Sequence, residues 1–188
     1  IVKCMIKRNV YNEGLTSAYN AFPKEKKNYN EILPAFEKLY EDVGIDVHFG
    51  PKLYYSTEDP TDIIVLELLE DYQMRPKIEG LDVEHVKRSL KWLAQFHAAS
   101  MKYYELNGPY GEDYKDGIFA ESVEKLYQPF YDSYFDHYIE ALKKLKNGDR
   151  YVEKAEKWRG NLFNLILKAI KFDENSPLNV LCHGDMWS

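Results

Sequence analysis

The sequence predicts an α+β fold built from two unequal lobes, a small mixed lobe over residues 1–72 and a mostly helical lobe over residues 73–188. Two apolar runs bounded by charged residues, IVKCMI at 1–6 and IIVL at 63–66, are typical of buried strands. From Asp82 onward, apolar residues recur every three or four positions, which is the period of amphipathic helices. Because a cleft between two lobes is a common ligand site, we expect a ligand to bind between them.

The smaller lobe is expected to combine one helix with several strands. The helix begins near Phe22, where Pro23 in the first turn loses no hydrogen bond, and it ends at Gly44. Pro34 should kink or break this helix, because proline lacks the N–H that a helix interior requires. The strands are expected at 1–6, 46–49, 52–55 and 63–66.

Three helical segments and one short strand are expected in the larger lobe. The first helix begins after Asp82, whose side chain suits the capping of exposed N–H groups. The second covers about 121–145, and the third about 151–169 with an interruption at Gly160. A strand at 178–182 completes the lobe. The predicted buried stripes are Val86, Leu90, Leu93, Ala94 and His97 on the first helix, and Leu126, Phe130, Tyr134, Tyr138 and Leu142 on the second.

Composition and charge argue against several classes of partner. The 188 residues carry a formal net charge of −6, which argues against binding the phosphate backbone of a nucleic acid. No apolar run reaches the roughly 18 residues that a membrane span requires. Cys4 and Cys182 are far apart and form no CxxC pair, so we expect a reducing compartment, the cytoplasm. The apolar start at Ile1 and the abrupt end at Ser188 suggest a piece of a longer protein.

Two charged residues, Lys3 and Glu25, stand where the pattern favours apolar side chains. Lys3 interrupts an apolar strand, and Glu25 falls on the apolar stripe of the first helix. A buried carboxylate is costly without a cationic partner, and Lys3 is one candidate. In protein kinases, a strand lysine and a helix glutamate of this kind hold the α- and β-phosphates of ATP. The alternatives are an edge strand that turns Lys3 to solvent, and a first-turn position where the helix dipole favours an exposed Glu25.

The motif His183-Gly184-Asp185 follows the last expected strand. An H-x-D turn at the end of a strand can present a carboxylate to a substrate hydroxyl and accept its proton as the bond to phosphorus forms. These three residues alone recur by chance. The kinase form also requires an asparagine five positions after the aspartate to hold Mg²⁺, which would be position 190, past Ser188.

Five segments, taken in order, resemble the ecdysteroid-kinase-like (CHK kinase-like) family, which is expanded in insects and related to choline kinases and aminoglycoside phosphotransferases. The segments are VKCMIK, FPKEKKNYNEILP, IIVLE, GLDVEHVKRSLKWLAQFHAAS and VLCHGDMWS, and together they span nearly the whole chain. The resemblance implies a protein-kinase-like bilobal fold, of which this chain is a part. It also implies ATP-dependent phosphoryl transfer to a hydroxyl of a small molecule, an ecdysteroid or a similar alcohol.

The resemblance assigns residues on the ATP side. Lys3 resembles the lysine that holds the ATP phosphates, and Glu25 resembles its helix partner. Glu67, Leu68 and Leu69 resemble the hinge that meets adenine. The family usually reads Leu-Glu-Asp-Leu at this hinge, whereas this chain reads Leu-Glu-Leu-Leu. Because backbone groups normally hold adenine there, the change need not abolish binding.

On the acceptor side, Asp185 resembles the catalytic base, and His183 would brace its turn through hydrogen bonds. ATP and Mg²⁺ are the implied cofactors. The glycine-rich loop would precede Ile1 and both Mg²⁺ ligands would follow Ser188, so no residue of this chain is expected to bind the metal. The chain by itself is therefore expected to be inactive.

Other functions stay open on the sequence. A kinase-like fold without turnover could bind a lipid, hormone or partner, and a choline- or aminoglycoside-type kinase would differ only in its acceptor. The tyrosine-rich helix at 121–145 could line a pocket for a flat apolar acceptor, although packing in a helical core is the commoner fate. His97 lies on an apolar helix face without a second ligand at zinc spacing, which favours a core position. The sequence does not indicate an oligomeric state.

Overall fold

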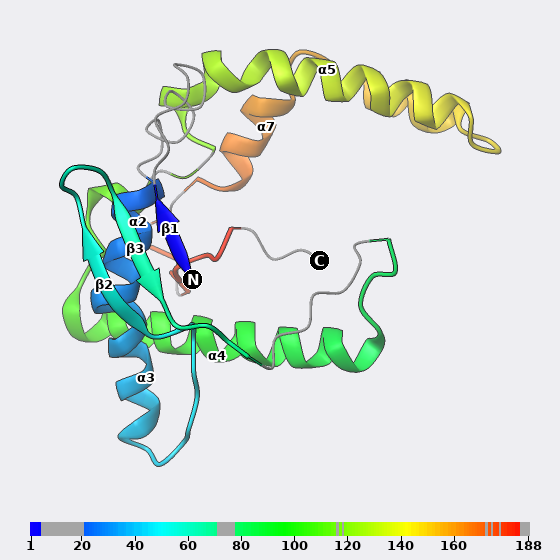
Figure 1. Cartoon of the computed structure of the whole chain (residues 1–188). Coiled ribbons are helices and arrows are strands. Elements are labelled where there is room, and N and C mark those ends of the chain that lie inside the picture. The colour runs from blue at the N-terminus through cyan, green and yellow to red at the C-terminus, as the bar shows by residue number, and fades with distance from the viewer. Residues whose placement is uncertain are drawn as a thin grey trace.

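The structure, a computed structural model, places a small sheet at one end of the molecule, with helices beside it and beyond it (Figure 1). The α+β class is confirmed. In the part of the chain that is described, no helix is both long and apolar enough to cross a membrane. The lobe boundary predicted at residue 72 lies outside the described residues and stays a prediction. The structure describes residues 1–4, 21–70, 78–115, 117, 119–171, 173, 175–176 and 178–184, without the side chains of Cys4 and Ser122.

Three short strands form an antiparallel sheet in which β3 (Ile63–Leu66) lies between β1 (Val2–Cys4) and β2 (Leu53–Thr57). Successive side chains of a strand point to opposite faces. On β3, Ile64 and Leu66 share one face and are both buried, whereas their neighbours are only partly covered. The strands predicted around Lys3 and near residues 55 and 65 are therefore confirmed within these bounds.

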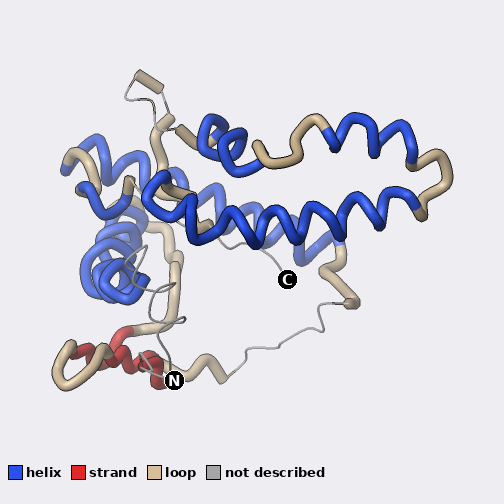
Figure 2. Tube along the Cα trace, turned by 90° about the horizontal axis from the view of Figure 1, so that it is seen from above, coloured by secondary structure: helices blue, strands red, loops and turns tan. Residues whose placement is uncertain are grey.

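One continuous helical run lies along a face of the sheet (Figures 1 and 2). It comprises α2 (Ala21–Lys27), a π-helical turn (Asn28–Ile32) and α3 (Leu33–Glu41). Pro34, predicted to kink or break the helix, lies in the first turn of α3, directly after the π-helical turn. A π-helical turn shifts the hydrogen-bond register by one residue, so the run continues past a residue that has no N–H to donate.

Two strand predictions are wrong for the residues described. Residues 46–49 and 178–182 are irregular, because side chains rather than a neighbouring strand bind their backbone groups. The Phe49 N–H donates to Glu37 Oε1 at 2.8 Å. The Leu181 N–H donates to the hydroxyl of Ser100, on the helix Val83–Asn107, at 2.5 Å. In both segments the short apolar run therefore indicates a buried stretch of chain that does not pair with a strand.

Helix α4 (Val83–Asn107) begins as predicted, since Asp82 accepts a hydrogen bond from the His85 N–H at 2.9 Å. Its predicted buried stripe is wrong, because Leu90 is 59% exposed and Val86 and Ala94 are also exposed. The side chains of α4 that pack against α3 and the neighbouring loops lie on a different face of the helix from the predicted stripe. They are Trp92, Phe96, Ala99, Ser100 and Tyr103.

Helices α5 (Glu124–Lys143), α6 (Asp149–Glu156) and α7 (Leu162–Ala169) follow, and α5 and α6 form a hairpin that points away from the sheet (Figures 1 and 2). The stripe predicted for α5 is also displaced, because Tyr134 is 71% exposed while Phe135 and Ile139 are buried. Only Leu142 of the predicted set is buried; Leu126 is partly covered. The interruption predicted at Gly160 is confirmed as the turn between α6 and α7.

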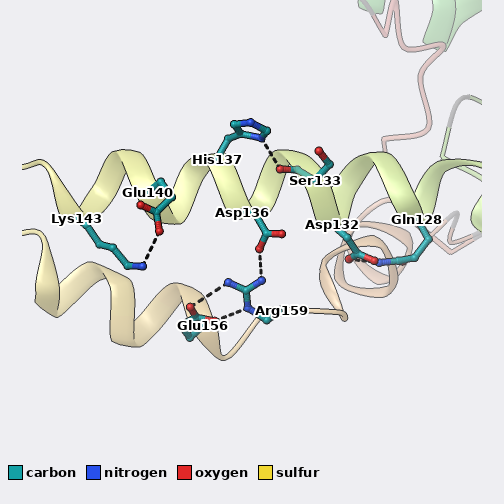
Figure 3. Close-up of polar contacts among 9 residues, drawn as sticks. All are labelled: Gln128, Asp132, Ser133, Asp136, His137, Glu140, Lys143, Glu156 and Arg159. Carbon is teal, nitrogen blue, oxygen red and sulfur yellow. Dashed lines mark hydrogen bonds and ion pairs between the residues drawn. The ribbon is translucent and has the colours of Figure 1, made fainter.

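A polar contact links α5 to the turn after α6 (Figure 3). The guanidinium of Arg159, in the turn after α6, binds Asp136 of α5 and also Glu156, with Nε of Arg159 2.6 Å from the Glu156 carboxylate. These groups are exposed, and exposed ion pairs contribute little free energy. We therefore assign the hairpin's stability mainly to the apolar cluster of Phe135, Ile139, Leu142 and Ala155.

The largest apolar cluster joins α3 to α4, two helices that the sequence assigned to different lobes. Its buried members are Ile32, Phe36, Phe49, Phe96 and Ala99. Phe36 is fully buried and makes edge-to-face contacts with the rings of Phe49, Phe96 and Tyr103.

Replacing Phe36 with alanine is expected to lower the free energy of unfolding by about 3–5 kcal/mol, because it removes a buried ring and leaves a cavity. Urea denaturation of the variant measures this loss. Phe130→Ala, at a partly exposed site on α5, is the matched control and should cost about 1 kcal/mol. Equal losses for the two variants would contradict the placement of Phe36 at the centre of this cluster.

Candidate functional site

The register of the sheet decides which way Lys3 points. Lys3 lies directly opposite Ile64, and directly opposed residues of an antiparallel pair share a face. Ile64 is buried, and Ser56, which also lies opposite Ile64, accepts a hydrogen bond from Asn30 of the α2–α3 run at 3.3 Å, so the run covers this face. Lys3 therefore points toward the helix, even though β1 is at the edge of the described sheet.

The Lys3 ammonium donates a hydrogen bond to the Glu25 carboxylate on α2, forming an ion pair between the strand and the helix. This is the pairing that the sequence suggested for Glu25. The side chains remain 47% and 30% exposed, so the pair lies at the rim of the sheet and is open to a ligand. An ammonium held in place and still accessible can bind an anionic group such as a phosphate.

Lys3 is fully protonated at neutral pH. Partial burial lowers the pKa of Lys3, but the hydrogen bond and charge of Glu25, with a smaller effect of Tyr29, outweigh it and raise the pKa above 10.5. Since the folded value exceeds the unfolded one, the stabilisation from this group is complete below pH 10.5 and is lost as the pH rises through the higher value. Burial has the opposite effect on the neighbouring Tyr29 hydroxyl, whose pKa it raises, so this hydroxyl stays neutral.

The segment after β3 is fixed to the sheet by Glu67. The Glu67 N–H donates to the Lys52 carbonyl at 2.8 Å, and its carboxylate accepts from the Lys52 N–H at 3.1 Å. Leu68 and Leu69, which follow, are both exposed. The side chain of Glu67 therefore anchors the segment to Lys52, directly before β2, and Leu68 and Leu69 lie at the surface.

The segment that carries the H-x-D motif leans on α4. Leu181 packs into the α3–α4 cluster, and the His183 ring lies edge-on to the Trp92 ring with 6.1 Å between centroids. Trp92 is itself held by a hydrogen bond from its Nε1 to the His48 carbonyl, at 3.1 Å. Asp185 lies outside the described residues, so its role as base stays a prediction.

Comparison with known proteins identifies the family. A family model of ecdysteroid kinase-like proteins matches residues 1–188. The chain belongs to the ecdysteroid kinase-like family. Neither a curated protein nor a solved structure matches it significantly. The α+β arrangement of this ecdysteroid kinase-like chain agrees with part of a kinase-like fold.

Among the described residues of the ecdysteroid kinase-like chain, no group of three His, Cys, Asp or Glu side chains could hold a metal ion. The expectation that both Mg²⁺ ligands follow Ser188 stays a prediction.

One residue of this region, Ser100, was missed in the sequence. Ser100 of α4 is fully buried, and its hydroxyl contacts both the Leu181 N–H and the Tyr110 hydroxyl. The available signal was the polar Ser100 on the stripe formed with Phe96 and Ala99, since a buried hydroxyl needs partners. The incorrect choice of stripe on α4 hid that signal.

Replacing Glu25 with glutamine in the ecdysteroid kinase-like chain is expected to bring the pKa of Lys3 below 10.5. Burial is the largest influence on this group and lowers its pKa, and the variant removes the main opposing charge. An NMR titration of the Lys3 side chain measures the change. Glu58→Gln, which removes the partner of Lys26 instead, should leave the pKa of Lys3 raised; a raised value in both variants would contradict the pairing.

Proposed function

We propose that the full-length protein is an ATP-dependent phosphotransferase that acts on a hydroxyl of a small molecule, an ecdysteroid or a similar alcohol. The observation that carries this proposal is the ion pair between Lys3 on the strand and Glu25 on the helix. Membership in the ecdysteroid kinase-like family supports the reaction class.

The ATP phosphates fit the Lys3–Glu25 pair by charge and access. Glu25 holds the ammonium at one position on the covered face of the sheet, and the exposed part of Lys3 remains able to bind phosphate oxygens. Positioning and charge are the main contributions that a protein makes to phosphoryl transfer. Bound Mg²⁺ would neutralise charge on the phosphates, with ligands that we expect beyond Ser188.

Adenine would bind at the hinge through backbone groups of Leu68 and Leu69. Glu67 is engaged with Lys52, which fixes the course of the chain as it leaves β3. The exposed leucine side chains also offer apolar surface to a flat ring. The change from the family's Leu-Glu-Asp-Leu to Leu-Glu-Leu-Leu is compatible with this arrangement, because the contacts proposed involve the backbone.

In the proposed reaction, the hydroxyl oxygen of the acceptor attacks the γ-phosphorus of ATP. A bond forms between that oxygen and phosphorus, the bond to the bridging oxygen breaks, and ADP leaves with the electron pair. The hydroxyl proton passes to the Asp185 carboxylate. His183 would position this turn through its contact with Trp92.

The test is an assay of the full-length protein with ATP, Mg²⁺ and three acceptors: an ecdysteroid, choline and an aminoglycoside. We expect ADP formation and a phosphorylated ecdysteroid, identified by mass spectrometry. Turnover with choline or the aminoglycoside alone would retain the phosphotransferase and reject the proposed acceptor. Binding of ATP or of the steroid without turnover of any acceptor would favour a non-catalytic binding protein.

A further inference from the structure

Residues 108–114, here called the strap, follow α4 and fold back against it. Gly108 and Gly111 adopt φ values of +79° and +102°, a region that favours glycine and that permits the sharp reversal. The Tyr110 ring stacks on the Tyr103 ring of α4, with 5.3 Å between centroids and 19° between planes. The strap therefore places Tyr110 back against α4, the helix that directly precedes it.

One end of the strap holds the segment that leads to the H-x-D motif. The Tyr110 hydroxyl lies 2.8 Å from Ser100 Oγ and donates to the Ser100 carbonyl at 2.9 Å. Because the only hydroxyl proton of Tyr110 goes to the Ser100 carbonyl, the Ser100 hydroxyl is the donor to the Tyr110 oxygen. Ser100 Oγ in turn accepts a hydrogen bond from the Leu181 N–H at 2.5 Å. Ser100 is 0% exposed and its partners are partly buried, so water has limited access to this ring of hydrogen bonds.

The ring of hydrogen bonds keeps its protons at every pH relevant to phosphoryl transfer. Burial raises the pKa of Tyr110 to about 12, although its hydrogen bond with Ser100 acts in the opposite direction. The Tyr110 hydroxyl therefore remains a donor at neutral pH, and the position of Leu181 does not depend on ionisation of the strap.

The other end of the strap holds the helix that carries Glu25. The Tyr114 hydroxyl donates to Asn28 Oδ1 at 2.9 Å, and Asn28 directly follows α2. Lys27, the last residue of α2, lies over the Tyr114 ring with 5.3 Å between Nζ and the centroid. Its ammonium also donates to the Tyr110 carbonyl at 3.4 Å.

We propose that the strap is a positioning device that fixes the phosphate-binding pair and the catalytic turn relative to each other. This inference rests on the proposed function. Asn28 is three residues from Glu25 and Leu181 is four residues from Asp185, so each contact of the strap lies within one turn or one short segment of a group assigned to the reaction. Ser100, Tyr110 and Tyr114 are positioning residues, since none is assigned a contact with substrate.

Two substitutions that each remove one hydroxyl oxygen test the two ends of the strap separately in the full-length protein. Tyr110→Phe keeps the stacking on Tyr103 and removes the hydroxyl that orients Ser100, so we expect kcat to fall about tenfold with the KM for ATP nearly unchanged. Tyr114→Phe releases Asn28 and should instead raise the KM for ATP by about fivefold. Tyr134→Phe, an exposed tyrosine on α5, is the matched control and should change neither constant.

Hydrogen exchange of backbone amides gives a readout that does not depend on activity. We expect faster exchange of the Leu181 amide in Ser100→Ala and Tyr110→Phe, and faster exchange in α2 and the π-helical turn in Tyr114→Phe. Both effects should be absent in Tyr134→Phe.

The outcomes distinguish the strap from the proposed function. Unchanged exchange in these variants, or faster exchange at Leu181 with a kcat within about twofold of the original, would overturn the positioning role. If the unmodified protein turns over no acceptor, the proposed phosphotransferase fails, and the exchange data alone decide whether the strap anchors the two segments. Faster exchange in the segment that each variant addresses would then still support the strap as the anchor of both segments.

Discussion

Asp185→Asn in the full-length protein is expected to lower kcat about a thousandfold and to leave ATP binding nearly intact. The amide has nearly the shape of the carboxylate, but it cannot accept the proton that leaves the acceptor hydroxyl. Since the residue is assigned to the acceptor side and the Lys3–Glu25 pair to the phosphates, the loss should affect chemistry and leave the affinity for ATP unchanged. Steady-state kinetics together with calorimetric titration of ATP measures both quantities.

The matched control for Asp185→Asn is Asp132→Asn. Asp132 is exposed on α5 and accepts a hydrogen bond from Gln128 at 2.7 Å, far along the chain from the assigned groups (Figure 3). Its replacement makes the same chemical change and should leave kcat as it was. Turnover that survives Asp185→Asn would remove this residue from the reaction and would leave the acceptor side of the site without a base.

Lys3→Met in the full-length protein is expected to lower kcat/KM for ATP by about a hundredfold to a thousandfold. Methionine fills the space of the lysine stem but carries no charge, so the phosphates lose their cationic partner. Glu25 then also lacks its ion-pair partner and would repel the phosphates through its own charge. A fluorescent ATP analogue should show weaker binding, in contrast to Asp185→Asn.

Lys26→Met is the matched control for Lys3→Met. It shows whether the effect is specific to the Lys3 ammonium or follows from the loss of any ion pair in the same lobe. Lys26 is the residue after Glu25 and forms its own ion pair with Glu58, between α2 and the β2–β3 connection. Its replacement removes a comparable contact and should change kcat/KM by less than about threefold. Equal losses for both lysine variants would indicate that the lobe as a whole had been disturbed and would contradict a specific role for Lys3.

Much of the sheet and the positions of Lys3 and Glu25 could be predicted because short-range patterns carry that information. A lysine inside an apolar strand and a glutamate on an apolar helix stripe are local anomalies. They made Lys3 a candidate partner of Glu25, and the ion pair in the structure confirms that pairing. The cap at Asp82 and the interruption at Gly160 depend on one or two residues, and both were found.

The buried faces of the helices could not be predicted in the same way. Helix α4 carries apolar side chains on more than one side, including Leu90 on the exposed side and Phe96 on the buried side. The period of apolar residues does not distinguish the two stripes, since both repeat every three or four residues. Packing against Phe36 and Phe49, more than 40 positions away, made the choice.

By itself the sequence determined the class of fold and the family signature, and it suggested Lys3 as a partner of Glu25, because each is carried by the type and spacing of nearby residues. Only the tertiary structure decided the direction in which Lys3 points, the backbone partners of Phe49 and Leu181, and the strap that joins α2 to α4. These features depend on contacts between residues distant in the chain. A side chain that satisfies a buried backbone N–H leaves no periodic mark on the sequence, so such contacts are found only once the elements have packed.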